Sequence, residues 1–248
     1  MSIKGKSLFL WSAALLTPLL VGVACAQTLS LDMGEGGGTF TGRMLQMILI
    51  LTVLSLAPSI LMMVTSFTRV VIVFSFLRNA MGLQQSPPNT VLVSLALFLT
   101  AFIMAPTLQK SYEEGIAPYM QEHIQEEEAF DKAVGPLRDF MLAHVREKDL
   151  ELFLGMSKAG EVKTPQDTPL KALIPAFMIS ELARAFEIGF IIFLPFIIID
   201  LAVASILMSM GMMMVPPMMI SLPFKVIFFV LIDGWHLLVG SLVKGYGT

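Results

Sequence analysis

Charged residues are scarce in this sequence. They make up 14% of its 248 residues, whereas 56% are hydrophobic, and the net charge is only −3. A soluble domain of this length needs far more polar surface, so the composition indicates a membrane protein. The sequence also lacks basic blocks interleaved with aromatic residues, and it therefore predicts no nucleic-acid partner.

Cysteine and histidine are also rare, with one and three residues respectively. Cys25 lies in a segment that we expect to be removed, and a mature chain without cysteine has no disulfide, catalytic thiol or thiolate metal site. His123 and His144 lack the spacing of metal ligands, and the HExxH, GxGD and Ser–His patterns of membrane proteases do not occur. We therefore expect no cofactor, no metal and no enzymatic activity.

The N-terminal 26 residues have the pattern of a secretory signal peptide. Two lysines near the start precede an apolar stretch over residues 8–23, and the small residues Ala24 and Ala26 form a cleavage site. This pattern predicts a mature chain that begins at Gln27. The alternative, an uncleaved signal anchor, is disfavoured because the apolar stretch is short for a membrane span.

Four later regions have the length and composition of membrane-spanning helices. They are residues 44–64, residues 91–108, residues 188–199 joined to 201–210 across Asp200, and residues 226–243 with Asp233 and His236 inside. No region shows the period-two alternation of strands. The fold class that follows is an all-α membrane protein.

Prolines are scattered through these regions, which predicts irregular helices. The prolines are Pro58, Pro106, Pro195, Pro216, Pro217 and Pro223. Broken helices at membrane depth persist only against other protein or a water-filled path. We therefore expect proline-broken helical hairpins over residues 44–108 and 174–248, buried at least partly against protein.

The charge distribution predicts the topology. A flexible polar segment, residues 27–43, precedes the first hairpin, and an acidic segment, residues 109–173, separates the two. Residues 110–171 alone carry 13 acidic and 8 basic side chains. With the mature N-terminus outside, the positive-inside bias places this acidic segment outside, on the periplasmic side. Within it, Pro136 suits the first turn of a helix with one apolar stripe.

Several ionisable residues interrupt or flank the apolar runs, where each costs about 2.5–3.5 kcal/mol at a helix centre unless it is paired. They are Arg69, Arg78, Glu181, Arg184, Glu187, Asp200, Lys225 and Asp233. Spacing predicts i,i+3 pairs of Arg184 with Glu181 and with Glu187. Asp200 and Asp233 have no local partner, so we expect Lys225 or Arg184 on another helix or subunit to pair with them.

Two roles are open for these charges. They could form a proton or ion relay, as in transporters, or they could join helices and subunits. The second role is favoured because the acidic residues do not form a continuous chain.

The motif GMMMVPP, residues 211–217, lies between the last two apolar regions. Gly211 relaxes the backbone, and neither Pro216 nor Pro217 can continue a helix, so the motif predicts a helix break.

The three methionines of this motif are Met212, Met213 and Met214. They cannot all lie on one helical face, which argues against packing as a stripe, although ordinary core packing remains an alternative. Methionine is unbranched and adaptable. Several copies of the turn around one axis would form an apolar constriction that excludes water and ions yet moulds around a polypeptide.

Two blocks, residues 62–106 and 174–242, carry the motifs TSFTR, FLRNAMG, SPPN, MSMGMMMVPP, LPFK and DGW. In these blocks, which cover a little under half of the chain, the sequence resembles the FliP family. Relatives from injectisomes share the membrane blocks but generally lack a cleavable signal, so the predicted signal peptide favours the flagellar branch over that alternative.

The resemblance implies a core subunit of the flagellar type III export gate, in the bacterial inner membrane at the flagellar basal body. It implies a helical homo-oligomer, a pentamer, that joins FliQ and FliR, with FlhB and FlhA completing the apparatus and FliO helping assembly. It further implies that unfolded flagellar proteins pass through, with residues 212–214 as a methionine gasket. A secondary transporter is the main rival, but its internal repeats and matched helix breaks are missing from the sequence.

Overall fold

The computed structural model describes residues 40–157, 164–212 and 214–247, and every regular element in these ranges is helical. The helices are α2 (Phe40–Met63), α3 (Phe67–Ala80), α4 (Asn89–Ser111), α5 (Ala117–Met120), α6 (Glu126–His144), α7 (Glu147–Ser157), α8 (Leu170–Ser209), α9 (Pro217–Leu231) and α10 (Gly234–Lys244), with a π-helix η1 (Tyr112–Ile116) and a 3-10 helix η2 (Pro165–Asp167). The predicted signal peptide, nearly all of the segment 27–43, and Met213 lie outside the described residues.

Three helical stretches are long and apolar enough to cross a membrane: Met44–Met63, Asn89–Met120 and Leu170–Ser209. A fourth is added if α9 and α10, which meet at a 61° bend, count as one broken span. These stretches overlap the four apolar regions of the sequence. The prediction of an all-α protein with membrane-spanning helices is therefore confirmed.

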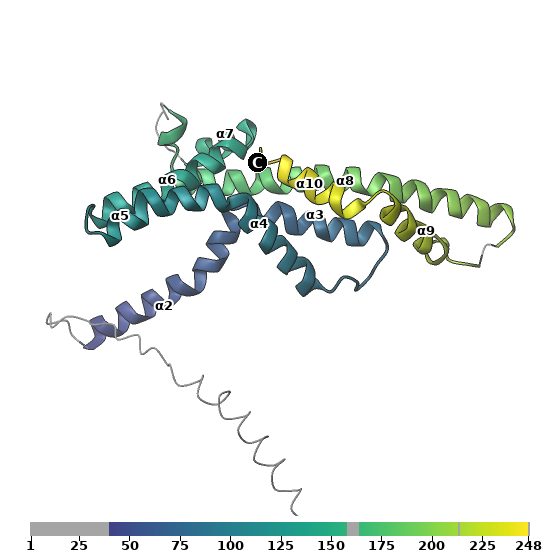
Figure 1. Ribbon diagram of the computed structural model, residues 1–248, viewed down its shortest axis with the longest axis horizontal. Helices are drawn as coiled ribbons and strands as arrows, with labels where there is room; N and C mark the ends of the chain where they lie inside the picture. The colour runs from purple at the N-terminus through teal and green to yellow at the C-terminus, as the bar shows by residue number, and fades with distance from the viewer. Residues whose placement is uncertain (1–39, 158–163, 213, 248) are drawn as a thin grey trace, which may run out of the picture. The chain divides into compact units, whose positions relative to one another are not determined.

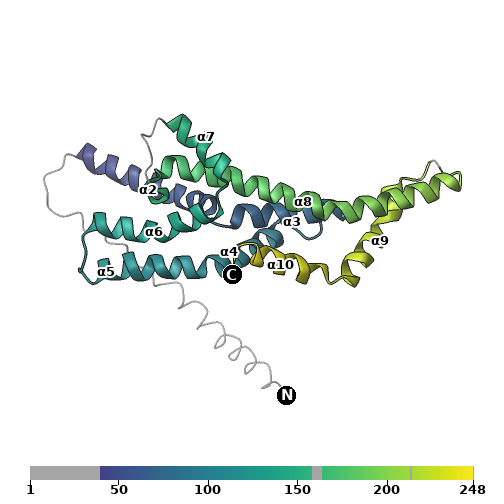
Figure 2. The same cartoon turned by 90° about the horizontal axis from the view of Figure 1, so that it is seen from above.

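The chain divides into two compact units, residues 1–51 and 52–248, and α2 begins in the first and ends in the second. The second unit is built on α8, whose 40 residues extend over roughly 60 Å at 1.5 Å per residue. Helix α3 packs along α8, α6 and α7 pack near its start, and α9 returns along its far end (Figures 1 and 2).

The core of this unit lies between α3, α4, α8 and the returning C-terminal helices. On α3 the buried side chains recur at helical spacing, at Val70, Val73, Phe74 and Leu77. They meet Ala185 and Phe196 of α8, Phe229 of α9, and Leu238 and Leu242 of α10.

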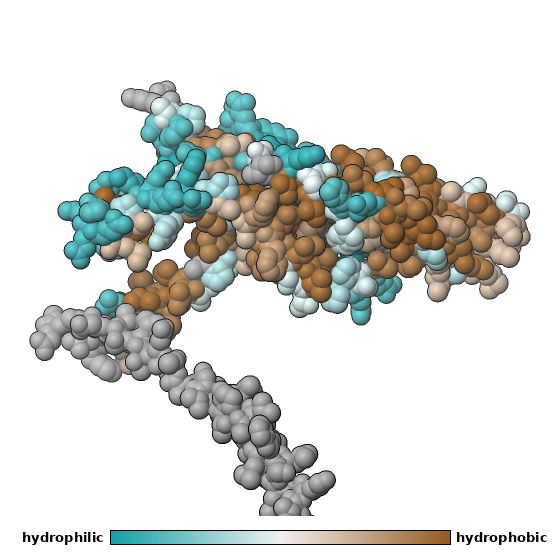
Figure 3. Space-filling model, in the orientation of Figure 1, coloured by the Kyte–Doolittle hydropathy of each residue, from teal (hydrophilic) through white to brown (hydrophobic). Residues whose placement is uncertain are grey.

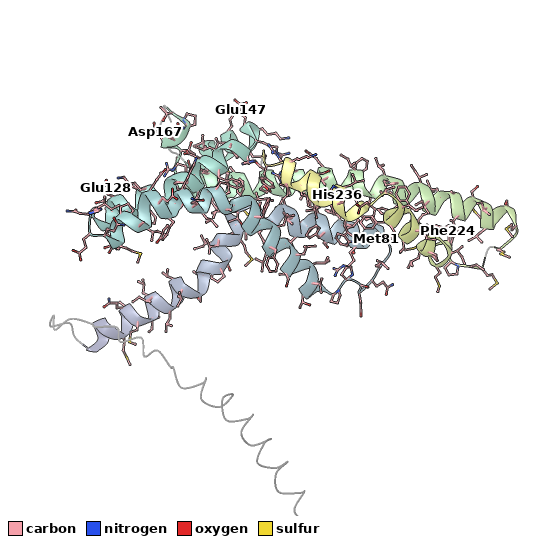
Figure 4. All side chains as sticks on the ribbon, viewed as in Figure 1. Met81, Glu128, Glu147, Asp167, Phe224 and His236 are labelled. Atoms are coloured by element: carbon pink, nitrogen blue, oxygen red, sulfur yellow. The ribbon has the colours of Figure 1, made fainter. Side chains whose placement is uncertain are left out.

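Polar and apolar surfaces separate along the unit. On the face drawn in Figure 3, hydrophilic residues gather over α5, α6 and α7, and hydrophobic residues cover the hairpin of α8 and α9. In Figure 4, Glu128, Glu147 and Asp167 lie in the polar part, whereas Phe224 lies on α9 in the apolar hairpin.

Four of the six prolines expected to break helices do not end one. Pro58, Pro106, Pro195 and Pro223 all lie inside helices, in α2, α4, α8 and α9. A proline removes one backbone hydrogen bond, but an apolar helix can continue when neighbouring groups support the freed carbonyl. In the C-terminal hairpin the breaks lie at the turn after α8, which ends at Pro216 and Pro217, and at the bend between α9 and α10.

The start of α6 also differs from the prediction. Pro136 lies inside α6, which begins ten residues earlier at Glu126. Three glutamates, Glu126–Glu128, occupy its first turn, where negative charge is stabilised by the N-terminal end of the helix dipole.

The close approach of η1 to α6 depends on a glycine. A Cβ added at Gly115 would lie 2.5 Å from the backbone nitrogen of Ala133 on α6, whereas one added at Gly135 would meet nothing within 4 Å. We predict that Gly115→Ala destabilises the protein by about 1–3 kcal/mol, because a backbone atom cannot move aside easily.

The matched control is Gly135→Ala, which should leave stability unchanged or raise it by up to about 1 kcal/mol. Thermal unfolding of the detergent-extracted protein measures both changes. Equal melting temperatures for the two variants would contradict this packing of η1 on α6.

Candidate functional site

The turn that ends α8 is closed by a glycine. Gly211 has a φ of +74°, and its N–H donates to the Met208 carbonyl at 3.1 Å. The next N–H, of Met212, donates to the Leu207 carbonyl at 3.0 Å. These two bonds form a Schellman motif, which satisfies the last carbonyls of the helix and fixes where it stops.

The far side of the turn is set by the two prolines. Pro216 precedes α9 and Pro217 is its first residue, a position that needs no backbone N–H donor. The residues predicted to break the helix thus stand at the ends of the turn.

The methionines of the turn project from the unit. The side chain of Met214 is 97% exposed and that of Met212 is 46% exposed, while Met213 lies outside the described residues. Four flanking methionines are also exposed: Met208, Met210, Met218 and Met219. The tip of the hairpin therefore presents flexible apolar side chains with few contacts within the described chain.

An ion pair lies behind this tip. Lys225 of α9 is buried, and its Nζ donates to Asp200 Oδ2 of α8 at 2.6 Å and to the Ala80 carbonyl at the end of α3 at 3.2 Å. The Ser221 hydroxyl donates to Asp200 Oδ1 at 2.5 Å. Lys225 therefore joins three helices at one point, and the last carbonyls of α3 favour its positive charge.

A second buried cluster lies further back along α8. The Arg69 guanidinium of α3 forms a bidentate salt bridge with the Glu181 carboxylate. Its Nε donates to Glu181 Oε2 at 2.9 Å, and its Nη2 donates to Oε1. Tyr246, just after α10, donates its hydroxyl to the same carboxylate, and its ring lies 4.0 Å from the Arg69 guanidinium carbon. This cluster attaches the C-terminal end of the chain to α3 and α8.

The aromatic residues of α6 complete that attachment. The Phe140 ring stacks on the Tyr246 ring with centroids 5.9 Å apart, and the His144 ring lies 5.0 Å away. Helix α6 is therefore held to the same point as α3, α8 and the C-terminal segment.

A third polar cluster joins α7 to α8. Arg146 Nε donates to Asp149 Oδ2 at 2.7 Å, and the Ser180 hydroxyl lies 2.7 Å from the same oxygen. Burial of Asp149 opposes its ionisation, but the hydrogen bonds from Arg146 and Ser180 outweigh burial and hold the pKa of Asp149 below its usual value. Asp149 is therefore a charged anchor at neutral pH.

The two predicted local pairs of Arg184 are wrong. Glu181 pairs with Arg69 instead, and Glu187 forms an ion pair with Arg146, with 3.6 Å between Oε1 and Nη1. Within the described part of the chain, Arg184 makes no ion pair within 4 Å. Glu181 does not pair with Arg184 because Arg69 binds it with two hydrogen bonds and the Tyr246 hydroxyl adds a third, more than Arg184 could supply from the next turn of the helix.

The other predicted charges are not brought together. Asp233, expected to be buried, is exposed, and Arg78 is only partly buried; neither has an ion pair among the residues that the structure describes. Tyr246, Ser221 and Asp149 were missed, because single polar residues beside or outside apolar runs carry no spacing signal.

The comparison with known proteins decides the family. The model of the FliP family matches residues 50–242. This chain belongs to the FliP family. It is 55% identical over 235 residues to the flagellar biosynthetic protein FliP of Caulobacter vibrioides, an alignment covering 94% of this chain and 88% of the relative.

Two further relatives carry the same name. The FliP of Bacillus subtilis is 54% identical over 201 residues, 81% of this chain and 91% of the relative. The FliP of Aquifex aeolicus is 52% identical over 220 residues, which cover 88% of this chain and 91% of the relative. The chain is thus a flagellar biosynthesis protein of the type III export apparatus, and the FliP family is a structural family and not an enzyme family.

The pair of Asp200 and Lys225 generates a prediction. Asp200→Ala should destabilise the folded chain by about 3–5 kcal/mol and reduce any oligomer on native gels, because it leaves the buried Lys225 charge unpaired. Lys225→Met should cost less, because Asp200 is partly exposed and keeps its hydrogen bond from Ser221. The double variant should lose less than the sum of the two single losses, since neither charge then remains. Glu151→Ala, at an exposed position on α7, is the control and should change neither quantity.

Normal folding and assembly of Asp200→Ala together with lost export would contradict this structural role. That outcome would favour the ion relay instead.

Proposed function

We propose that this FliP family member is a pore-forming subunit of the flagellar type III export gate, through which unfolded flagellar proteins cross the bacterial inner membrane at the flagellar basal body. The observation that carries the proposal is the tip of the α8–α9 hairpin. A Schellman turn and two prolines fix its backbone, while the methionine side chains around it are exposed.

The exposed methionines support a role in a shared constriction. One hairpin cannot enclose a path, whereas several identical hairpins related by rotation can close a ring. Met212, Met213 and Met214 of each copy would then line an apolar constriction that excludes water and ions. Unbranched side chains with three rotatable bonds can repack around a passing polypeptide.

The ion pair behind the tip supports the same role, because a seal needs a fixed base. Lys225 joins α8 and α9 to the end of α3, so the hairpin is held at that level. The next residues toward the turn, 201–220, are largely exposed within the described chain. In this proposal the base keeps its position while the methionines rearrange.

The proposed assembly is a homo-pentamer that joins FliQ and FliR, with FlhB and FlhA as further components and FliO as an assembly factor. The acidic segment 109–173 faces the periplasm, and the chain begins at Gln27 after removal of the signal peptide. The segregation of polar residues over α5, α6 and α7 supports this orientation (Figure 3).

Replacing Met212, Met213 and Met214 together by alanine tests the proposal. The ring should assemble normally but leak small ions and dyes in cells that make the complex, because the smaller side chains cannot close the constriction. The matched control is Met156→Ala, an exposed methionine on α7 at 60% exposure, which should not change leakage.

A native gel shows whether the complexes are intact. Intact complexes with unchanged leakage would place the seal elsewhere and return the three methionines to ordinary packing.

A further inference from the structure

Asp233 occupies an unusual place in the described chain. It lies at the bend between α9 and α10 with a left-handed backbone, φ +51° and ψ +53°, and its side chain caps no N–H of α10. The carboxylate is exposed, and it has neither a hydrogen bond nor an ion pair to any residue that the structure describes. Because the helix pair around it is apolar enough to cross a membrane, an unpaired carboxylate here is costly and calls for a cation.

Arg78, in turn, is a cation that lacks a carboxylate partner within the described chain. It lies in the last turn of α3, and its Nη1 lies 3.4 Å from the Pro87 carbonyl. Its Nε is buried without an acceptor among the described residues. A guanidinium has five N–H donors, so most of its hydrogen-bonding capacity is unused within the described chain.

The chain neighbours of the two charged residues contact the same part of the core. The rings of Phe74 and Trp235 are in edge contact, with centroids 6.2 Å apart. Leu77 and Gly234, the direct neighbours of Arg78 and Asp233, line one apolar cavity of about 340 Å³. Yet Arg78 and Asp233 themselves form no pair within the chain.

Other cations are less suited to Asp233. Lys225 is bound to Asp200, and Arg69 is bound to Glu181. Arg184 lies one turn from Glu181 on α8, and Glu181 binds Tyr246 beyond the C-terminal end of α10, whereas Asp233 precedes the N-terminal end of that helix.

We propose that Arg78 of one copy of this chain binds Asp233 of the neighbouring copy. The inference rests on the proposed homo-oligomer and identifies one contact that would hold it together. If Arg78 of each copy binds Asp233 of the next copy, the contact is head-to-tail, and its repetition around an axis closes a ring.

Charge reversal tests the pair in the full complex. Arg78→Asp and Asp233→Arg should each reduce the oligomer on native gels by roughly tenfold or more, because each variant places like charges at every contact. The two changes in one chain should restore most of the oligomer, because every contact regains one opposite pair. Arg184→Asp combined with Asp233→Arg is the matched control and should not restore it.

A second measurement avoids placing arginine in the left-handed conformation of Asp233. In a chain with Cys25→Ser, the variant Arg78→Cys/Asp233→Cys should give covalent dimers and larger species with a short bifunctional thiol reagent. Each single cysteine variant should give none. Arg184→Cys/Asp233→Cys should also give none.

Links only within one chain, or no links at all in an intact oligomer, would overturn the proposed pair. A wild-type oligomer that persists in that case leaves the export-gate proposal standing. A wild-type chain that forms no oligomer contradicts the export-gate proposal itself.

Discussion

The ionisable residues on α8 impose the constraint on which the rest of the structure depends. A long apolar helix that carries Glu181 and Asp200 can be stable only if cations reach both carboxylates. Arg69 reaches the first from α3, and Lys225 reaches the second from α9. The chain must therefore run along α8 twice, once before it and once after it, and the C-terminal Tyr246 completes the first cluster.

These polar contacts divide the second unit into a fixed body and a free tip. Up to the level of Lys225, α8 is joined to α3 by the salt bridge of Arg69 with Glu181, to α7 by the hydrogen bond of Ser180 with Asp149, and to α6 by the edge-to-face contact of Phe177 with Phe140. Beyond it, most of the described residues between 201 and 220 are exposed, and the described methionines among them are exposed. A rigid base with an adaptable apolar end is what a seal around a variable polypeptide requires.

Much of this organisation could be predicted from the sequence, and the failures have a physical cause. The apolar regions and the break at Gly211–Pro217 are local features, since they depend on composition and on backbone chemistry. The partner of Glu181 is not local, because spacing cannot weigh Arg184, three residues away, against Arg69 on a distant helix. Nor does composition identify the second break, where Asp233 takes a left-handed conformation and Phe229 packs against the bare backbone of Gly234.

The central claim is that the hairpin tips of several copies meet around one axis, held there by the charges behind them. Disulfide formation at the tip tests this directly, because a disulfide needs Cα atoms about 4.4–6.8 Å apart. In a chain with Cys25→Ser, Met214→Cys should form linked dimers under mild oxidation of the membrane complex. Met156→Cys on α7 should not. Intact complexes in which Met214→Cys stays unlinked would contradict the account.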